Sequence, residues 1–335
     1  MTQRKHPTKH ITTLILSTLL TGVVGCISGG QNDLRTAVQA VRDSESDQIV
    51  LLEDGKPILR YNYSTVDPGE LSKFSAENLK YARPRSNYIH PLYGFAGEEL
   101  TYDWSVDHPH HRGIYWAWPE VKLGEAMGDL HALQRVFARP TGDPKLTSGD
   151  GYGQIEAENL WLWEDSTPIV REIAIIRAYR SAGHGRYVDL WFQFTALEDN
   201  VTVARRDMDK YGGLNVRLAS VTDQVITFHT DDEESNPRIA WAELSGIFKG
   251  GTSLTGLSIL QNEANPDYPG TWIEYPELNW FQPTFPASLK RFPLRQAEPL
   301  VLQYRLWIHR GRADEESHAE VWREYNRAQA PSASD

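Results

Sequence analysis

The sequence predicts a mostly β protein, an antiparallel β-sandwich with one C-terminal helix. Short apolar runs rich in β-branched and aromatic residues recur between Gly, Pro, Asn and Asp turns. Only residues 314–328 show helical spacing, with Ala319, Trp322 and Tyr325 on one face. Many closely spaced strands followed by a single helix are typical of two packed antiparallel sheets.

The first 26 residues are expected to be a signal and not part of the fold. Basic residues precede an apolar run at 11–20, and Val23-Val24-Gly25-Cys26 then resembles a bacterial lipobox, whose cysteine becomes the lipidated N-terminus. An ordinary secretory peptide or a membrane helix is the alternative, although a span needs about 20 apolar residues. We expect an exported lipoprotein, anchored through Cys26 to the bacterial cell membrane at the outer membrane or the periplasmic face. Ile27 follows the cysteine, which favours the outer membrane.

Residues 27–47 are polar with a weak helical patch, and we expect a flexible tether there. A single sandwich domain then spans 48–330. It begins with a hairpin in which Asp54-Gly55 joins the runs 49–52 and 57–63. The further strands are expected at 115–118, 154–163, 169–179, 186–197, 213–219, 239–245, 257–261 and 300–309. The stretch 120–153 lacks a clear period and is expected to be a loop that covers the site.

Composition excludes several classes of function. The chain has 34 Lys and Arg against 45 Asp and Glu, a net charge of −11, so no basic face for nucleic acid is expected. Its one cysteine excludes a disulfide within the chain and a cysteine-based metal site. The 11 Trp and 15 Tyr fit β-structure and also sugar recognition, where aromatic faces stack on sugar rings. The expected partners are a carbohydrate ligand and, through the lipid anchor only, a membrane.

The run Asp107-His108-Pro109-His110-His111-Arg112 indicates a functional site, because imidazoles titrate near neutrality and bind metals, and the Arg fork grips oxygen groups. His108 could equally be a turn residue before proline. His110 and His111 are adjacent, so an extended chain would point them to opposite faces. His90 and His131 could reach the cluster only through folding. No cofactor is predicted, but neutral imidazoles suit Zn or Cu, and no ligand spacing decides between metal binding and hydrogen bonding.

Several ordered motifs resemble the PmoA-like family of uncharacterised bacterial secreted proteins. The motifs are Tyr88–Gly94, Leu100-Thr101, Asp107–Gly113, Trp116–Trp118, Tyr211–Leu214 with Arg217, Trp241–Gly246 and Asn265-Pro266. The family label comes from a subunit of methane monooxygenase that crosses the membrane repeatedly. This chain has no apolar run of about 20 residues after position 26, so that function is excluded.

A second resemblance links Pro91-Leu92-Tyr93-Gly94, followed by His111 and Arg112, to the galactose mutarotase-like β-sandwiches. It implies a supersandwich whose concave face holds a sugar, with His111 and Arg112 among the contacts. Mutarotases use a His acid and a Glu base from a late strand. This chain departs from the pattern, because Lys210–Gly213 stands where the middle strand should bring the His.

The candidate base is a late carboxylate. Glu274 follows Trp272 and Glu277 follows Pro276, and either one could also be a solvated loop acid. Glu243, beside Trp241, is an alternative acid. We therefore expect catalysis by His111 and Glu274. The expected substrate contacts are His90, Tyr93, His108, His110, Arg112, Trp116, His131, Tyr211, Arg217 and Glu243.

These residues lead to three hypotheses about function. The first is an enzyme that epimerises a sugar or cleaves a glycosidic bond by His/Glu acid–base chemistry. The second is a glycan-binding lipoprotein without catalysis. The third is a His-ligated metalloprotein, for which converging imidazole nitrogens would be the discriminating feature.

Overall fold

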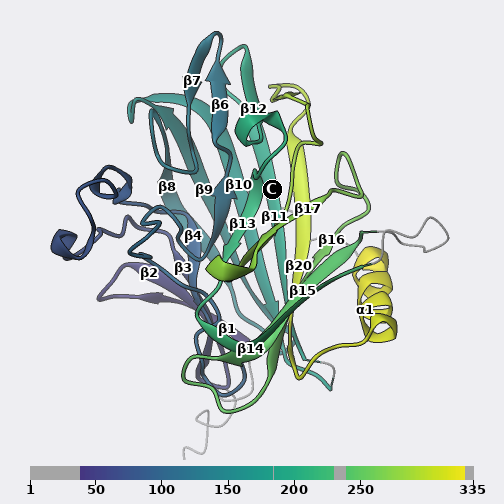
Figure 1. Ribbon diagram of the computed structural model, residues 1–335. Helices are drawn as coiled ribbons and strands as arrows, with labels where there is room; N and C mark the ends of the chain where they lie inside the picture. The colour runs from purple at the N-terminus through teal and green to yellow at the C-terminus, as the bar shows by residue number, and fades with distance from the viewer. Residues whose placement is uncertain (1–37, 184, 230–238, 329–335) are drawn as a thin grey trace, which may run out of the picture. The chain divides into compact units, whose positions relative to one another are not determined.

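Two large antiparallel sheets and one small sheet form the framework, shown in Figure 1. The computed structural model describes residues 38–183, 185–229 and 239–328. The expected signal segment with Cys26 therefore lies outside the described residues. The sheets and the single described α-helix confirm the predicted class, a mostly β sandwich with a C-terminal helix. No helix in the described ranges is long and apolar enough to cross a membrane.

The first sheet has eight strands. Their order across the sheet is β1 (Val38–Asp43), β2 (Gln48–Glu53), β3 (Lys56–Asn62), β4 (Tyr88–Leu92), β5 (Ile114–Ala117), β13 (Gly213–Arg217), β18 (Trp280–Pro283) and β17 (Trp272–Tyr275). The predicted hairpin at Asp54-Gly55 is confirmed, because β2 and β3 pair on either side of it.

The second sheet also has eight strands. Their order is β14 (Val221–Phe228), β15 (Trp241–Phe248), β16 (Thr255–Gln261), β20 (Leu300–Arg310), β11 (Arg186–Ala196), β10 (Thr167–Tyr179), β9 (Tyr152–Trp163) and β8 (Val136–Thr147). A small sheet joins β19 (Phe292–Pro293), β12 (Val201–Ala204), β6 (Glu120–Leu123) and β7 (Ala126–Gly128). Short 3-10 turns occupy Leu71–Lys73, Leu79–Tyr81, Arg206–Met208 and Pro276–Leu278.

The core lies between the two large sheets. The Trp116 ring packs edge-on against Phe192 and Phe194 of β11, with ring centroids 5.0 Å apart in both pairs. Successive side chains on a strand point to opposite faces. Because Trp116 points into the core, its neighbour Tyr115 points to the outer face of the first sheet, where the polar site described below is found.

Helix α1 (Glu315–Arg327) is confirmed where the 3.6-residue period predicted it. The Asp314 side chain accepts a hydrogen bond from the Ser317 amide at 2.8 Å, which satisfies one free donor at the helix start. The buried face of α1 packs on Trp241, Leu260 and Trp307 of the second sheet. Figure 1 shows the helix beside β15 and β16.

Two expectations about local structure are corrected. The segment expected to be a tether contains β1, because Val38 and Ala40 alternate inward and are buried in the core. The expected loop 120–153 contains β6, β7 and β8. Strand β8 is an edge strand, and its C-terminal half is largely exposed. The edge tolerates Pro140, Gly142 and Pro144, and no apolar alternation marks this half in the sequence.

Candidate functional site

The outer face of the first sheet carries buried polar side chains. Tyr115 of β5 pairs with Asn215 of β13, and Arg217 of β13 pairs with Trp280 of β18. Asn215 and Gln282 are both 0% exposed. Among the described residues, neither amide atom of Asn215 nor Nε2 of Gln282 has a hydrogen-bond partner. Buried polar atoms are normally paired, so these orphaned atoms indicate that this face binds something polar.

Two turns place four histidines over this face. In the first turn the His111 amide donates to the His108 carbonyl at 2.9 Å. It ends at Gly113, whose φ is 66° and where a Cβ would lie 2.2 Å from the Ile89 carbonyl oxygen, so only glycine fits. The second turn, after β7, brings His131 within 4.6 Å of His110 and 5.2 Å of His111, measured between ring centroids.

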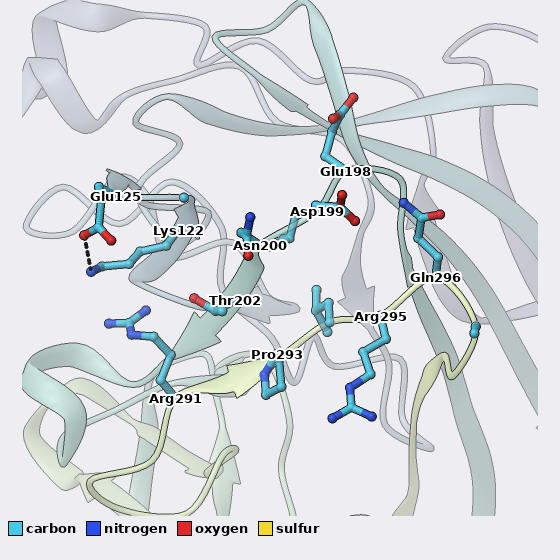
Figure 2. Close-up of a pocket in the computed structure, with 14 residues that line it drawn as sticks. Lys122, Glu125, Glu198, Asp199, Asn200, Thr202, Arg291, Pro293, Arg295 and Gln296 are labelled. Atoms are coloured by element: carbon cyan, nitrogen blue, oxygen red, sulfur yellow. Dashed lines mark ion pairs between the residues drawn. The ribbon is translucent and has the colours of Figure 1, made fainter.

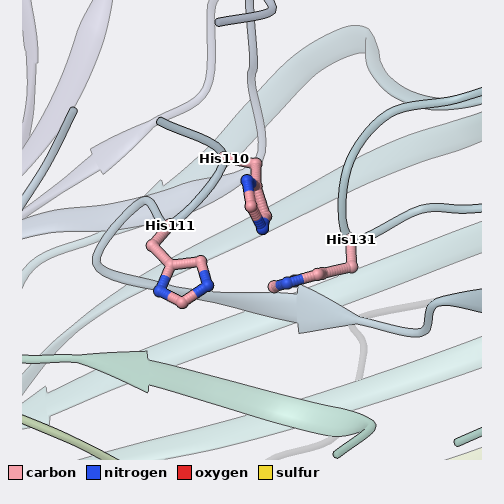
Figure 3. Close-up of side chains that lie close together, drawn as sticks. All are labelled: His110, His111 and His131. Carbon is pink, nitrogen blue, oxygen red and sulfur yellow. The ribbon is translucent and has the colours of Figure 1, made fainter. Parts of the chain in front are cut away.

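The rings of His110, His111 and His131 converge, as Figure 3 shows. One ligand nitrogen from each lies within 4.8 Å of the other two. Zinc–nitrogen bonds of about 2.0–2.1 Å would place tetrahedral ligands about 3.3 Å apart. Small side-chain rotations would therefore close the three nitrogens around an ion. The distant segments 107–112 and 129–135 form one cluster only through the fold.

Burial keeps these imidazoles neutral. It lowers the pKa of His110 to about 3, with further lowering by the positive field of His108 and nearby arginines. Burial also holds the pKa values of His111 and His131 well below the usual range. Nδ1 of His131 lies 3.0 Å from the Tyr115 hydroxyl, which fixes its ring. Neutral imidazoles with free lone pairs are the form that binds metal ions.

Beside the cluster lies a pocket of about 360 Å³, which we call the histidine pocket. Its lining combines imidazoles, carboxylates, an arginine and aromatic rings: Asn78, Tyr81, Asp107, His108, His110, Asp129, His131, Ala132, Gln134, Arg206 and Tyr211. Asp129 accepts from Arg206 at 2.8 Å, and burial raises its pKa despite that contact. The Tyr211 ring lies 5.4 Å from the Trp280 ring, which adds aromatic surface.

Two residues predicted to contact the substrate, Arg112 and Arg217, instead support the turn beside the pocket. Arg112 is 1% exposed, pairs with Asp103 and lies over the Trp104 ring, 3.4 Å from its centroid. Arg217 donates to Ser105 at 3.3 Å and lies 3.8 Å from Asp107. Both arginines therefore hold the turn that carries the histidines. Neither of them lines the histidine pocket.

The remaining predicted residues are dispersed. Trp116 lies in the core, and Glu243 lies beneath α1. Nδ1 of His90 lies 3.0 Å from the Thr101 hydroxyl, and the backbone of Tyr93 forms an isolated β-bridge with that of Glu99. These positions separate four of the expected substrate contacts from the histidine pocket.

The structure does not bring Glu274 to His111. Tyr275 stacks on Trp280 at 4.8 Å, so strand alternation directs Glu274 to the other face of β17. Glu274 lines a different hollow, with Phe228 and Trp272. Glu274 therefore lies apart from the histidines, and sequence reasoning missed these groups near them: Asp129, Arg206, Tyr81, Trp280, Asn215 and Gln282. Only Asn215 could have been found from the sequence, because it lies two residues before Arg217 and therefore on the same face of that strand.

A larger hollow of about 850 Å³ lies at the small sheet and is shown in Figure 2. Its described lining is dominated by long charged side chains such as Lys122, Glu198 and Arg295, without an imidazole or an aromatic ring. Lys122 there pairs with Glu125 at 4.0 Å. The hollow lacks convergent chemistry, so the histidine pocket is the stronger candidate site.

Comparison with known proteins identifies a family but no activity. The model of a family of unknown function, DUF6807, matches residues 48–323. No curated protein matches the chain. The PmoA-like and mutarotase-like resemblances gain no support from these comparisons and stay predictions.

Proposed function

We propose, for a chain that belongs to the DUF6807 family of unknown function, that the histidine pocket acts on a carbohydrate with a divalent metal ion held by His110, His111 and His131. The observation that carries the proposal is the convergence of three neutral imidazoles beside a polar pocket. Three protein ligands with a fourth position open toward a pocket are the pattern of catalytic, not structural, zinc.

The pocket lining supports a hydroxylated substrate. Tyr81 and Tyr211 offer flat apolar faces, and Asp107, Asp129 and Arg206 offer hydrogen-bonding edges. Its volume falls within the range of small-molecule sites. The sequence resemblance to galactose mutarotase-like sandwiches points to the same ligand class. Among the described residues, the Asn215 amide and Nε2 of Gln282 supply further unpaired polar atoms on the same sheet face.

The residues suggest epimerisation or bond cleavage. His110, His111 and His131 would hold the ion, which would supply Lewis-acid chemistry toward a substrate oxygen or a bound water. Asp129, whose pKa burial raises, is the best-placed group to exchange a proton with the substrate. Arg206 contacts Asp129 and would hold its orientation. Asp129 thus takes the part that the sequence assigned to Glu274.

The test is a panel of monosaccharides and oligosaccharides incubated with the full chain in mild detergent, with zinc or with chelator. We expect binding and product with zinc, and the loss of both with chelator or in His131→Ala. The matched control is Glu274→Gln, which should behave like the wild type. Binding and turnover that are unaffected by His131→Ala would contradict the proposal. Binding without product would favour the glycan-binding alternative.

We also propose that the protein is exported and lipid-anchored through Cys26, from the basic, apolar and small-residue pattern of residues 4–26. In bacterial cells Cys26→Ser should abolish acyl labelling and release the chain from the membrane fraction. Unchanged partitioning with undiminished labelling would refute the anchor.

A further inference from the structure

A second group of side chains that could hold a metal ion lies beneath α1, on the outer face of the second sheet. It consists of Glu243 on β15, Ser258 on β16, His309 on β20 and His318 on α1, and we call it the helix-covered cluster. All four side chains are buried. We propose that it binds a divalent transition-metal ion of the zinc class that fastens the C-terminal helix to the sheet. This proposal is independent of the function proposed for the histidine pocket.

Two of the three distances between ligand atoms already match a bound ion, and the ligand atoms of all three residues lie within 4.8 Å of one another. Oε2 of Glu243 lies 3.2 Å from Nε2 of His318 and 3.4 Å from Nε2 of His309. Ligands of a tetrahedral zinc ion are about 3.3 Å apart. The Ser258 hydroxyl lies 2.8 Å from Nε2 of His318 and 3.2 Å from Nε2 of His309, so it completes the group. Two imidazoles and one carboxylate form a known zinc ligand set.

The hydrogens of the cluster also point to a cation. Nδ1 of His318 lies 2.9 Å from the Asp314 carbonyl oxygen, which only accepts, so Nδ1 carries the proton. In a singly protonated ring, Nε2 of His318 presents a lone pair to the Glu243 carboxylate, whereas a second proton on Nε2 would make this contact an ion pair. The Ser258 hydroxyl has a single hydrogen, so it cannot donate to Nε2 of both His309 and His318. A metal ion between Nε2 and Oε2 satisfies both lone pairs, and the Nδ1 contact is the outer bond that orients a ligating histidine.

The surroundings are shaped for this arrangement. Gly256 pairs with His309 across the strands, and a Cβ there would lie 2.1 Å from the imidazole, so the glycine makes room for the ring. The Trp241 ring stacks on His318 at 5.6 Å, and Trp307 lies 4.3 Å from His309, both as centroid distances. These indoles shield the cluster from water, which strengthens the binding of an ion.

The ligands come from three strands and one helix, so ion binding would join α1 to the sheet. Metal sites that exist only in the folded chain contribute their binding free energy to folding. The ion is therefore expected to act on stability and on the docking of α1, while the histidine pocket keeps its own chemistry.

The experiment measures zinc in the full chain by mass spectrometry after metal loading and dialysis. A His131→Ala background removes the contribution of the histidine pocket. In that background we expect about one zinc ion per chain and a rise in melting temperature on zinc addition. Adding Glu243→Gln, which keeps the side-chain shape, should abolish both. The matched control is Glu274→Gln, an exposed carboxylate that should leave both unchanged.

Cobalt gives a readout that does not depend on how the Glu243 variant folds. The His131→Ala chain loaded with Co²⁺ should show the intense visible absorption of four-coordinate cobalt with nitrogen and oxygen ligands. No bound zinc and no such band in this background would overturn the proposal, as would zinc that persists in Glu243→Gln. Failure of the histidine-pocket proposal looks different, because wild type would then hold one ion that survives His131→Ala.

Discussion

The histidine pocket and the helix-covered cluster use the same side chain in opposite surroundings. In the pocket, His110 and His131 line an open hollow, and the Nδ1 atoms of His110 and His111 have no partner among the described residues. In the helix-covered cluster, Glu243 and Ser258 already face the two imidazoles. Open ligand positions indicate chemistry on a substrate, whereas ligand positions already filled by the protein indicate a contribution to stability.

The two clusters also differ in how the chain builds them. The helix-covered cluster lies on regular strand register, with Glu243 paired to Ser258 and Gly256 paired to His309. The histidine pocket depends on turns held by buried arginines. Disturbing one of these arginines should therefore damage the pocket through stability, while changing a histidine in it should damage ligand binding.

The largest effect is expected for Arg112→Ala. The change leaves Asp103 without its buried ion-pair partner and removes the stacking on Trp104. Breaking a buried pair in this way costs about 3–5 kcal/mol of unfolding free energy. Urea denaturation measures this loss. The control Arg42→Ala removes exposed pairs with Asp47 and Asp143 and should cost far less, because water screens such pairs. Equal losses of unfolding free energy in the two variants would contradict a structural role for Arg112 beside the pocket.

The next effect separates the two histidine groups. His318→Ala leaves the buried Glu243 carboxylate without one of its partners, so we expect a loss of about 3 kcal/mol in unfolding free energy. His111→Ala leaves no charged side chain without a partner, so the loss in unfolding free energy should be on the order of 1 kcal/mol. It should instead weaken zinc binding at the pocket by at least about 100-fold, about 2.7 kcal/mol. Calorimetric zinc titration and chemical denaturation together read both quantities. A larger stability loss in His111→Ala than in His318→Ala, with unchanged zinc binding at the pocket, would contradict the proposed difference between the two clusters.

Acid should act on the two clusters in different pH windows. The pKa of His110 is about 3 in the fold against 6.5 for a free imidazole, so only unfolded chains bind that proton between those values. Stability is then present above pH 6.5 and falls as pH drops toward 3, by about 1.4 kcal/mol per unit for each such histidine. Burial alone would raise the pKa of Glu243, but contacts with His309 and His318 lower it to about 2, so its contribution is lost only between about 4.5 and 2.

Stability measured from pH 7 to 4.5 in His110→Gln tests these windows. The variant should show a shallower decline than wild type above pH 4.5. A slope that His110→Gln leaves unchanged would show that this histidine is not buried neutral.

How far the sequence predicted this molecule depends on the kind of signal. Regular alternation predicted β9, β10 and β11, and helical spacing predicted α1. Strand β1 was missed because only its first half alternates inward, and edge strand β8 was missed because an exposed edge needs no apolar alternation. The run 107–112 located the pocket, since its histidines crowd within one turn. Asp129 and Trp280 could not be placed, because their contacts depend on long-range folding.

The smallest effect is expected at Glu274, which the sequence had assigned as the base. Glu274→Gln changes a carboxylate on the far face of β17 from Tyr275. It should leave sugar binding and turnover within about twofold of wild type, and the stability within about 0.5 kcal/mol. Kinetics and a melting curve suffice to measure this. A large loss of turnover with an unchanged melting temperature would restore Glu274 as a participant.

The central claim is that the histidine pocket holds a metal ion with a position left open for a ligand. Anomalous diffraction at the zinc absorption edge, from crystals of the full chain grown with zinc, locates every bound zinc ion directly. We expect a peak about 2.0–2.1 Å from one nitrogen each of His110, His111 and His131, with its remaining side facing the pocket. A map without density between these three rings, whatever it shows beneath α1, would contradict it.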